Sequence, residues 1–249
     1  ENYQKWLDFA ELPAYLREEL VAMDEKTKED AFYTNLEFGT AGMRGLIGAG
    51  TNRINIYVVR QATEGLAQLI DSKGEEAKKR GVAIAYDSRH FSPEFAFESA
   101  QVLAAHGIKS YVFESLRPTP ELSFAVRHLH TFAGIMVTAS HNPAPFNGYK
   151  VYGEDGGQMP PADADALTDY IRAIENPFTV QLADLEESKA NGLIEVIGEN
   201  VDAEYLKEVK GVNINQDLIN EYGRDMKIVY TPLHGTGEML ARRALAQAG

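Results

Sequence analysis

The sequence predicts an α/β protein, a three-layer sandwich in which helices cover both faces of a mainly parallel, mixed sheet. Short apolar runs suited to buried strands lie at residues 82–86, 110–114 and 132–138. Amphipathic segments with helix-start signals separate these runs, and such an alternation is typical of β-α-β units. A similar pattern begins again near the C-terminus. We therefore expect a first domain over residues 1–200 and the start of a second, similar α/β domain over residues 201–249.

Residues 3–34 are predicted to be helical. Trp6, Phe9 and Leu12 share one face, Pro13 interrupts the pattern, and apolar residues at helical spacing continue beyond it. Because an amphipathic helix usually covers a core, we expect a helical extension that packs on the first domain. A contact between subunits is the alternative.

Start and end signals place the other helices and strands. Ser92 and Thr119 are expected to cap two helices, each with proline at its first position, and Gly107 ends the first of them. Asn147-Gly148 is a turn signal before a strand at residues 149–152. Further helices are predicted at residues 56–71, 163–174 and 182–192, and a further strand at residues 193–197.

Beyond the first domain, the sequence predicts a short helix, a strand at residues 227–232 and a helix that reaches Gly249. Gly235 and Gly237 fit a tight turn between that strand and that helix. One strand and one complete helix cannot bury a core of their own. We therefore expect the chain to be the N-terminal part of a longer protein.

The composition limits the possible classes of function. Of the 249 residues, 44% are hydrophobic and 24% are charged, the usual balance of a soluble globular protein. The net charge of −13 argues against nucleic acid or an anionic membrane as a partner, and no apolar run is long enough to span a bilayer. The acidic, amphipathic N-terminus is not a secretory signal. The absence of cysteine excludes disulfides and thiolate metal sites, which fits a cytoplasmic protein.

Positive charge is concentrated locally on this acidic chain. Residues 39–60 contain Arg44, Arg53 and Arg60 and no acidic residue, and five glycines fall within the first twelve positions. Glycines let backbone N–H groups approach a ligand, and the fork of Arg44 can hold a phosphate in bidentate fashion. The segment matches neither a P-loop nor a dinucleotide-binding fingerprint. A site for a small anion is one interpretation, and a flexible turn with a solvated arginine is the other.

Polar loops follow the apolar strands. The loops at residues 87–91, 115–119 and 139–146 come after predicted parallel strands. Since the carboxyl ends of such strands share one edge of the sheet, where ligands bind, we expect these loops to meet there.

The last of these loops contains Ser140, His141 and Asn142 in succession, and Lys150 follows ten residues after the serine. The loop lacks the G-x-S-x-G pattern of a hydrolase nucleophile. We expect the side chains of Ser140 and His141 to point apart in extended backbone, which makes His141 a poor general base for its neighbour. A serine hydrolase is therefore the weaker interpretation.

Phosphoryl transfer fits the same residues better. It requires an oxygen that carries the phosphoryl group and cations that neutralise the phosphoryl oxygens. Ser140 supplies the oxygen, and Arg44, His141 and Lys150 supply donors and charge. Asn142 helps to make the turn rigid. A phosphoserine brings about −1.5 to −2 charges at neutral pH, which suits this cationic setting and favours binding of Mg²⁺.

Four segments together resemble the α-D-phosphohexomutase superfamily, most closely its bacterial phosphoglucomutase/phosphomannomutase branch. In chain order they are FGTAGMRG, YDSRHFSPEFA, TASHNPAPFNGYKVYGEDGGQM and YTPLHGTGE. The T-A-S-H-N-P element followed by G-Y-K is the most specific part, and the four segments are spread over nearly the whole chain. The resemblance implies four domains around a central cleft, with this chain containing the first and the start of the second.

The resemblance also implies an activity and roles for residues. Such an enzyme is an isomerase, an intramolecular phosphotransferase that interconverts glucose 1-phosphate and glucose 6-phosphate, with glucose 1,6-bisphosphate as intermediate and activator. Ser140 matches the serine that is phosphorylated in the resting enzyme, and its phosphate would give Mg²⁺ one ligand. Arg44, His141 and Lys150 would lie beside it, with Lys150 as proton-transfer partner or clamp. With Asn142 these residues form the expected phosphate-binding set.

Several parts of the family pattern are missing from this sequence. They are the D-G-D-x-D-R metal loop, the sugar-selecting G-E-x-S-G loop and the phosphate-binding loop of the fourth domain. Asp163 and Asp165 superficially resemble the metal loop but are better explained as solvated residues at a helix start. We expect the other Mg²⁺ ligands and the choice between glucose and mannose to lie in the remaining domains of the same polypeptide, and this chain to be inactive alone. A non-catalytic domain that binds sugar phosphates or acts as a scaffold is the alternative.

Overall fold

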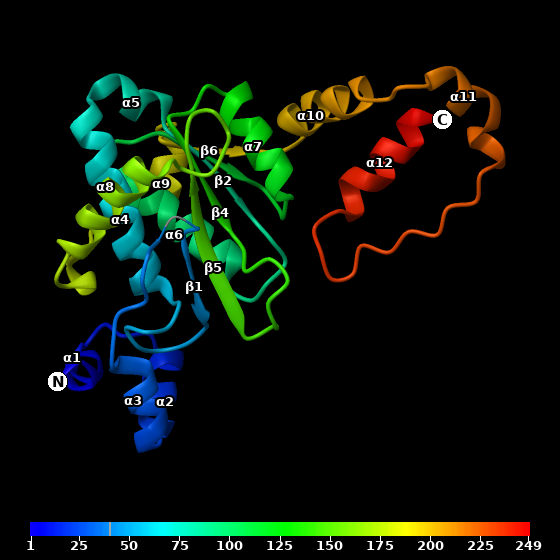
Figure 1. Cartoon of the computed structure of the whole chain (residues 1–249). Helices are drawn as coiled ribbons and strands as arrows, with labels where there is room; N and C mark the ends of the chain where they lie inside the picture. Colours follow the sequence, from blue (N-terminus) through cyan, green and yellow to red (C-terminus); the bar gives the residue numbers. More distant parts are fainter. Residues whose placement is uncertain (40) are drawn as a thin grey trace.

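The computed structural model describes residues 1–39 and 41–249, and Figure 1 shows how its elements are arranged. A six-stranded sheet forms the centre, in the order β1-β5-β4-β2-β3-β6. β4, β2, β3 and β6 are parallel neighbours, whereas β5 is antiparallel to both β4 and β1. The mainly parallel, mixed sheet expected from the sequence is therefore confirmed. The strands are β1 (Met43–Leu46), β2 (Val82–Tyr86), β3 (Ser110–Phe113), β4 (Ala133–Val137), β5 (Phe146–Tyr152) and β6 (Ile194–Ile197).

Helices cover both faces of the sheet, because successive residues of a strand face opposite sides. Ile84 of β2 belongs to a core on one face, whereas Ala83 and Ala85 belong to a second core on the other. These two cores give the three layers expected from the sequence. The first face carries α4 (Ile56–Lys73), α6 (Ser92–Ala105), α8 (Pro161–Arg172) and α9 (Leu185–Ala190), with α5 (Glu75–Arg80) and the short 3₁₀ helix η1 (Pro177–Thr179) beside α4, and the second face carries α7 (Thr119–His128) and α10 (Glu199–Gly211).

The N-terminal segment is helical, as expected, and packs on the first core. It forms α1 (Asn2–Asp8), α2 (Ala14–Ala22) and α3 (Glu25–Phe32), at the lower end of the molecule in Figure 1. Trp6 is only 2% exposed and makes edge-to-face contacts with Tyr57 of α4. An edge-to-face pair with a buried indole is a typical core contact. The expectation of a helical extension that packs on the domain is therefore confirmed.

The prediction of a turn at Asn147-Gly148 is wrong, since both residues lie inside β5. Gly148 pairs with Arg44 of β1 on one side, and on the other its carbonyl accepts from the amide of Thr138, the residue after β4. A Cβ at Gly148 would lie 2.5 Å from the carbonyl oxygen of Thr138 and 2.9 Å from that of Met43. The glycine therefore serves close approach of three strands rather than a turn. Likewise β1 forms inside the glycine-rich run, where the sequence suggested a loop.

Two helices begin slightly differently from the prediction. Ser92 and Thr119 are the first helical residues of α6 and α7, and the preceding Phe91 and Pro118 occupy the cap positions. The side chain of Ser92 does not cap the helix because its hydroxyl donates to Asp87 instead, at 2.7 Å. The helix end at Gly107 is confirmed by its left-handed φ of 70°.

The C-terminal segment differs most from the prediction. Residues 227–232 form no strand, and the side chain of Val229 is fully exposed. A strand requires a neighbour for its backbone hydrogen bonds, and the described chain provides none here. Figure 1 shows α11 and α12 beside α10, away from the sheet. The remaining elements are α11 (Gln216–Tyr222), the 3₁₀ helix η2 (Gly223–Asp225) and α12 (Glu238–Ala248).

The division between domains after residue 200 falls in the first turn of α10, and it stays a prediction. Val201 and Leu206 of this helix are buried, so α10 adheres to the first domain while it leads to the next segment. Within the described ranges, no helix combines the length and apolar composition needed to cross a membrane.

Candidate active site at the serine loop

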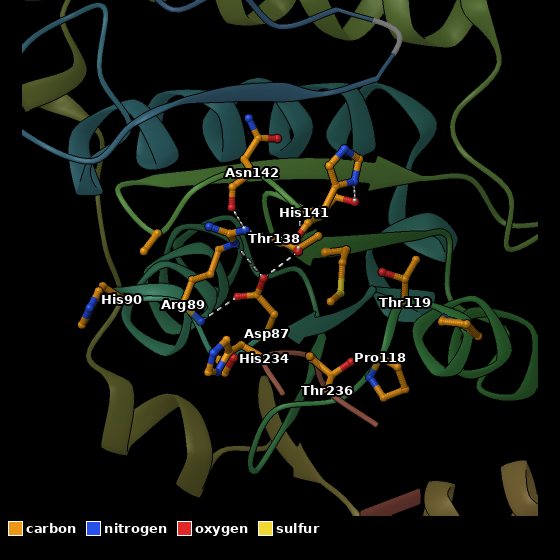
Figure 2. Close-up of a pocket in the computed structure, with 16 residues that line it drawn as sticks. Asp87, Arg89, His90, Pro118, Thr119, Thr138, His141, Asn142, His234 and Thr236 are labelled. Carbon is orange, nitrogen blue, oxygen red and sulfur yellow. Dashed lines mark hydrogen bonds and ion pairs between the residues drawn. The ribbon is translucent and has the colours of Figure 1, made fainter. Parts of the chain in front are cut away.

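The polar loops at the carboxyl ends of β2, β3 and β4 enclose one pocket, as the sequence predicts. Its volume is about 570 Å³, and the turn before α12 closes it on the remaining side (Figure 2). Ser140, His141 and Asn142 line it, whereas Arg44 and Lys150 lie beside it. The lining residues are Asp87, Ser88, Arg89, His90, Pro118, Thr119, Pro120, Met136, Thr138, Ser140, His141, Asn142, Ala144, His234, Gly235 and Thr236.

Ser140 has an unusual backbone conformation, with a φ of 55° in the left-handed region. The turn bends so sharply there that Ser140 Oγ lies 3.3 Å from Nδ1 of His141. The premise that the two side chains point apart in extended backbone is therefore wrong. Both residues are exposed, so the hydroxyl faces the open pocket and has an imidazole within reach as a proton partner.

Arg44 comes from β1, far from the serine loop in sequence, and yet contacts it. Its Nη1 donates a 2.5 Å hydrogen bond to Oδ1 of Asn142. Arg44 pairs with Gly148 across β1 and β5, and Lys150 lies two residues further along β5. Arg44 and Lys150 therefore share one face of the sheet. Lys150 also pairs with Met136 of β4, which lines the pocket.

These two cations are not neutralised by neighbours. Within residues 1–39 and 41–249, neither Arg44 nor Lys150 forms an ion pair with a carboxylate. Partial burial and, after it, the charge of Arg44 lower the pKa of Lys150. Two unpaired cations at the edge of a pocket favour an anionic ligand, because a phosphate would relieve their repulsion.

The sequence predicted a loop at residues 87–91 after a buried strand but assigned no role to Asp87 or Arg89. Asp87 is buried, and Arg89 reaches under the serine loop, as Figure 2 shows. The guanidinium of Arg89 donates to four backbone carbonyl oxygens of that loop. The position of Asp87 and Arg89 directly after a buried parallel strand was the sequence signal that could have revealed their role at the site.

The turn before α12 also reaches the pocket. His234, Gly235 and Thr236 line it, and the amide of Gly235 bonds back to the carbonyl of Pro232 in a tight turn. Gly237 directly precedes α12. The sequence predicted a tight turn at Gly235 and Gly237 but not that it would face the serine loop.

The described residues do not provide a complete metal site. No group of three or more histidine, aspartate or glutamate side chains converges within them. Asp87, the acidic residue among those that line the pocket, is already engaged, because its oxygens accept hydrogen bonds from Ser92 and Thr138. Asp163 and Asp165 are exposed at the start of α8, as expected. A divalent cation at Ser140 would therefore need most of its ligands from elsewhere.

Comparison with known proteins identifies the family. The family model for phosphoglucomutase/phosphomannomutase, alpha/beta/alpha domain I, matches residues 35–178, which include the whole serine loop. The chain belongs to this family. The resemblance inferred from the four sequence segments is thereby confirmed.

Curated relatives and solved structures agree with this assignment. The chain is 40% identical to a phosphoglucomutase of Staphylococcus saprophyticus over 90% of its own length and 39% of the relative's length. It is 37% identical to a phosphoglucomutase of Staphylococcus haemolyticus, covering 95% of this chain and 41% of that relative. The chain thus spans about two fifths of the relatives it matches.

Two solved structures have the same fold. The putative phosphomannomutase from Thermus thermophilus superposes with a TM-score of 0.59 at 27% identity, covering 72% of this chain and 36% of that chain. The phosphoglucomutase parafusin from Paramecium, in its open form, gives a TM-score of 0.61 at 19% identity, covering 87% of this chain and 42% of that one. The second likeness concerns the fold alone.

Proposed function

We propose that this chain is the phosphoserine-bearing part of a longer enzyme, an intramolecular phosphotransferase that interconverts hexose 1-phosphates and hexose 6-phosphates. The observation that carries the proposal is the exposed hydroxyl of Ser140 on a left-handed turn, beside the unpaired cations Arg44 and Lys150. Such a site suits a group that gains and loses a phosphoryl dianion. Glucose is the proposed sugar because the matched relatives are named phosphoglucomutases.

The proposed reaction has two half-reactions at Ser140. First, a hydroxyl oxygen of the sugar phosphate loses its proton and attacks the phosphorus of phosphoserine 140. The bond from phosphorus to Oγ breaks, and Oγ receives a proton. The resulting glucose 1,6-bisphosphate then reverses its orientation in the site. Oγ of Ser140 gives up its proton and attacks the other phosphoryl group of the bisphosphate. The bond from phosphorus to the sugar oxygen breaks, and that oxygen takes up a proton. The phosphoserine is restored and the isomeric monophosphate is released.

Each residue near Ser140 has a proposed part in these steps. His141 Nδ1, 3.3 Å from Oγ, exchanges the proton with the hydroxyl. Lys150 has a lowered pKa and gives up a proton more readily than an ordinary lysine, so it can act as proton-transfer partner or clamp. Arg44 and Asn142, joined by their hydrogen bond, bind the phosphoryl oxygens with Lys150.

The cofactor and partners belong to the same proposal. Mg²⁺ would neutralise the phosphoryl oxygens when bound, with the phosphate on Ser140 as one ligand and the others from domains outside this chain. Glucose 1,6-bisphosphate would serve as activator, and hexose phosphates as substrates in the cytoplasm. The remaining domains of the same polypeptide would complete the sugar site, so that the chain is inactive alone.

The test uses the full-length protein that contains this chain. With Mg²⁺ and glucose 1,6-bisphosphate, it should convert glucose 1-phosphate to glucose 6-phosphate, and Ser140→Ala should abolish this. Ser72→Ala, which changes a serine at the far end of α4, is the matched control and should keep full activity. Full activity in Ser140→Ala would exclude the proposal.

Two further outcomes would point to the alternatives. A wild-type protein that stays unphosphorylated after incubation with glucose 1,6-bisphosphate would favour a scaffold. Because Ser140 and His141 are in contact, reaction of Ser140 with a fluorophosphonate probe would favour a serine hydrolase. The mutase serine should not react with this probe.

A further inference from the structure

The guanidinium of Arg89 contacts only protein groups among the described residues, namely backbone carbonyls of the serine loop and the carboxylate of Asp87. Its Nη1 donates to the carbonyl oxygens of Pro143 at 2.9 Å and Phe146 at 3.0 Å. Its Nη2 donates to the carbonyl oxygens of Ser140 at 3.0 Å and Asn142 at 2.5 Å. Its Nε lies 3.4 Å from Oδ2 of Asp87. Of the five N–H donors of a guanidinium, the four on Nη1 and Nη2 are therefore used by backbone carbonyls, and the fifth, on Nε, faces the carboxylate of Asp87.

A second line of hydrogen bonds reaches the amide of Ser140. Oδ2 of Asp87 accepts a 2.6 Å hydrogen bond from the hydroxyl of Thr138. The oxygen of that hydroxyl in turn accepts a 3.0 Å hydrogen bond from the N–H of Ser140. Asp87 is itself held by Ser92 Oγ at 2.7 Å and by the amide of Arg89 at 3.0 Å. Thus Asp87 organises both the Arg89 contacts and the Thr138 contact.

These contacts surround one strained residue. Ser140 has a φ of 55°, in the left-handed region that residues other than glycine rarely adopt. Such a conformation persists only where surrounding contacts determine it. Here the N–H of Ser140 is fixed by Thr138 and its carbonyl by Arg89, so both flanking peptide groups are held.

We propose that Asp87, Arg89 and Thr138 are positioning residues that hold Ser140 in its left-handed turn and so aim its hydroxyl into the pocket. Arg89 lines an anion pocket, and yet it acts on the loop and does not bind the phosphate of the substrate. This inference rests on the proposed phosphoserine function of Ser140. It separates the arginine that shapes the loop, Arg89, from the arginine left for the phosphoryl group, Arg44.

The test measures how fast Ser140 is phosphorylated in the full-length protein. Dephosphorylated enzyme is mixed with increasing glucose 1,6-bisphosphate and Mg²⁺, and intact mass gives the rate constant at saturation and the half-saturating concentration. The variants are Arg89→Lys, which keeps the charge but loses the fork, and Thr138→Val, which keeps the shape but loses the hydroxyl. Thr138→Ser restores the hydroxyl and serves as the rescue.

Arg80→Lys is the matched control for Arg89→Lys. Arg80 also donates to two backbone carbonyls, those of His130 and Thr131, and pairs with Glu154. It precedes β2, whereas Arg89 follows it, so it lies at the opposite end of the domain from the pocket. Arg80→Lys therefore shows how much the rate constant changes when an arginine that binds backbone carbonyls is replaced away from the pocket.

Positioning residues should change the rate constant and leave the half-saturating concentration nearly unchanged. We expect Arg89→Lys and Thr138→Val to lower the rate constant on the order of 10- to 100-fold, because a misplacement of about 1 Å can cost 100-fold. Thr138→Ser and Arg80→Lys should stay within roughly threefold of wild type, the scatter expected when the reacting atoms are not displaced.

Three results would overturn the inference. One is an unchanged rate constant in Thr138→Val. Another is an Arg89→Lys variant whose rate constant is normal but whose half-saturating concentration rises at least roughly tenfold, the mark of a lost ligand contact. The third is a Thr138→Ser variant as slow as Thr138→Val. If Arg89→Lys fails to fold, the two Thr138 variants decide alone. A wild-type protein that is never phosphorylated at Ser140 refutes the proposed function instead, so the two failures are distinguishable.

Discussion

Two arginines close to the pocket are used in opposite ways. Arg89 has its side chain 13% exposed and binds mainly backbone carbonyls of the serine loop. Arg117 has its side chain 1% exposed and binds a carboxylate, Asp202 of α10, through two hydrogen bonds of 2.7 and 2.8 Å. Arg117 directly precedes Pro118, which lines the pocket. The first arginine shapes a loop, and the second fixes α10, the helix that leads to the next segment.

The surroundings of the two arginines also differ in whether their charged groups are paired within the protein. Around Arg117, a second carboxylate, Glu121, is completely buried, and neither of its oxygens has a hydrogen-bond donor in the part of the chain that the structure describes. Burial and, after it, the neighbouring Asp202 raise the pKa of Glu121 to about 9. As a neutral acid Glu121 can donate its proton to Asp202, so Arg117 faces one buried ionised carboxylate, Asp202, and one buried neutral acid, Glu121. At the serine loop, in contrast, neither Arg44 nor Lys150 has a carboxylate partner within residues 1–39 and 41–249.

The largest effect on stability is expected at Arg117. Arg117→Met removes both hydrogen bonds to the buried Asp202 and leaves it only the more distant Arg243, at 3.9 Å. This should lower the free energy of unfolding by about 3–5 kcal/mol. Urea denaturation measures this. Arg242→Met, which breaks an exposed pair with Glu238 on α12, is the control and should not change stability measurably. A loss below about 1 kcal/mol in Arg117→Met would mean that the buried pair does not hold α10.

Thr138→Val should lower the free energy of unfolding by a smaller amount. It leaves Oδ2 of Asp87 and the amide of Ser140 without the hydroxyl between them, and a lost buried hydrogen bond costs about 1–3 kcal/mol. The same denaturation experiment gives the value, with Thr138→Ser as the hydroxyl-retaining control. If Thr138→Val destabilised the protein more than Arg117→Met, the contacts of the serine loop would contribute more to stability than the buried pair at α10.

Glu121 should make stability depend on pH. Its folded-state pKa lies above the ordinary value of 4.5, so between these values the unfolded chain is ionised there while the folded chain retains the proton. The free energy of unfolding should therefore fall as pH rises from about 5 to 9, by up to about 1.4 kcal/mol per pH unit. In Glu121→Gln this component is absent.

The informative quantity is the difference between wild type and Glu121→Gln across pH. His106, whose pKa is raised by its hydrogen bond to Glu64, also destabilises the fold as pH rises through its folded-state pKa. It is the same in both proteins and cancels. A difference that stays constant from pH 5 to 9 would show that Glu121 is ionised in the folded protein.

The smallest expected effect concerns Lys150. Arg44→Gln removes the like charge beside it and should raise the pKa of Lys150, although burial, the larger cause, still holds this pKa below the ordinary lysine value. Titration of the lysine Nζ by NMR in the dephosphorylated protein measures the change. Arg44→Lys keeps the charge and should keep the pKa low. An unchanged pKa in Arg44→Gln would mean that the two cations do not interact.

Local pattern was sufficient to predict the parts of the structure that depend on neighbouring residues. The strands β2, β3 and β4, the helices between them and the meeting of their loops at one edge follow from apolar runs and turn signals. Ser140 was selected because a hydroxyl, an imidazole and an amide follow a buried strand.

Contacts between distant residues explain what sequence reasoning missed. Asn147 and Gly148 signal a turn locally, but two flanking strands hold them in β5. The left-handed φ of Ser140 depends on Arg89, 51 residues away. The pairing of Arg117 with Asp202 joins residues 85 apart. No periodicity contains such information. The likeness of the four motifs, in contrast, indicated the family, because these motifs include residues from several elements at once.

A chase of labelled phosphoserine tests the role of Ser140 most directly. Full-length protein that carries ³²P on Ser140 is mixed with excess glucose 1-phosphate and Mg²⁺ and quenched at millisecond intervals. The label should leave Ser140, appear in glucose 1,6-bisphosphate and end in glucose 6-phosphate. Label that stays on the protein while unlabelled glucose 6-phosphate accumulates, or that is released only as inorganic phosphate, would contradict a phosphoryl-carrying Ser140.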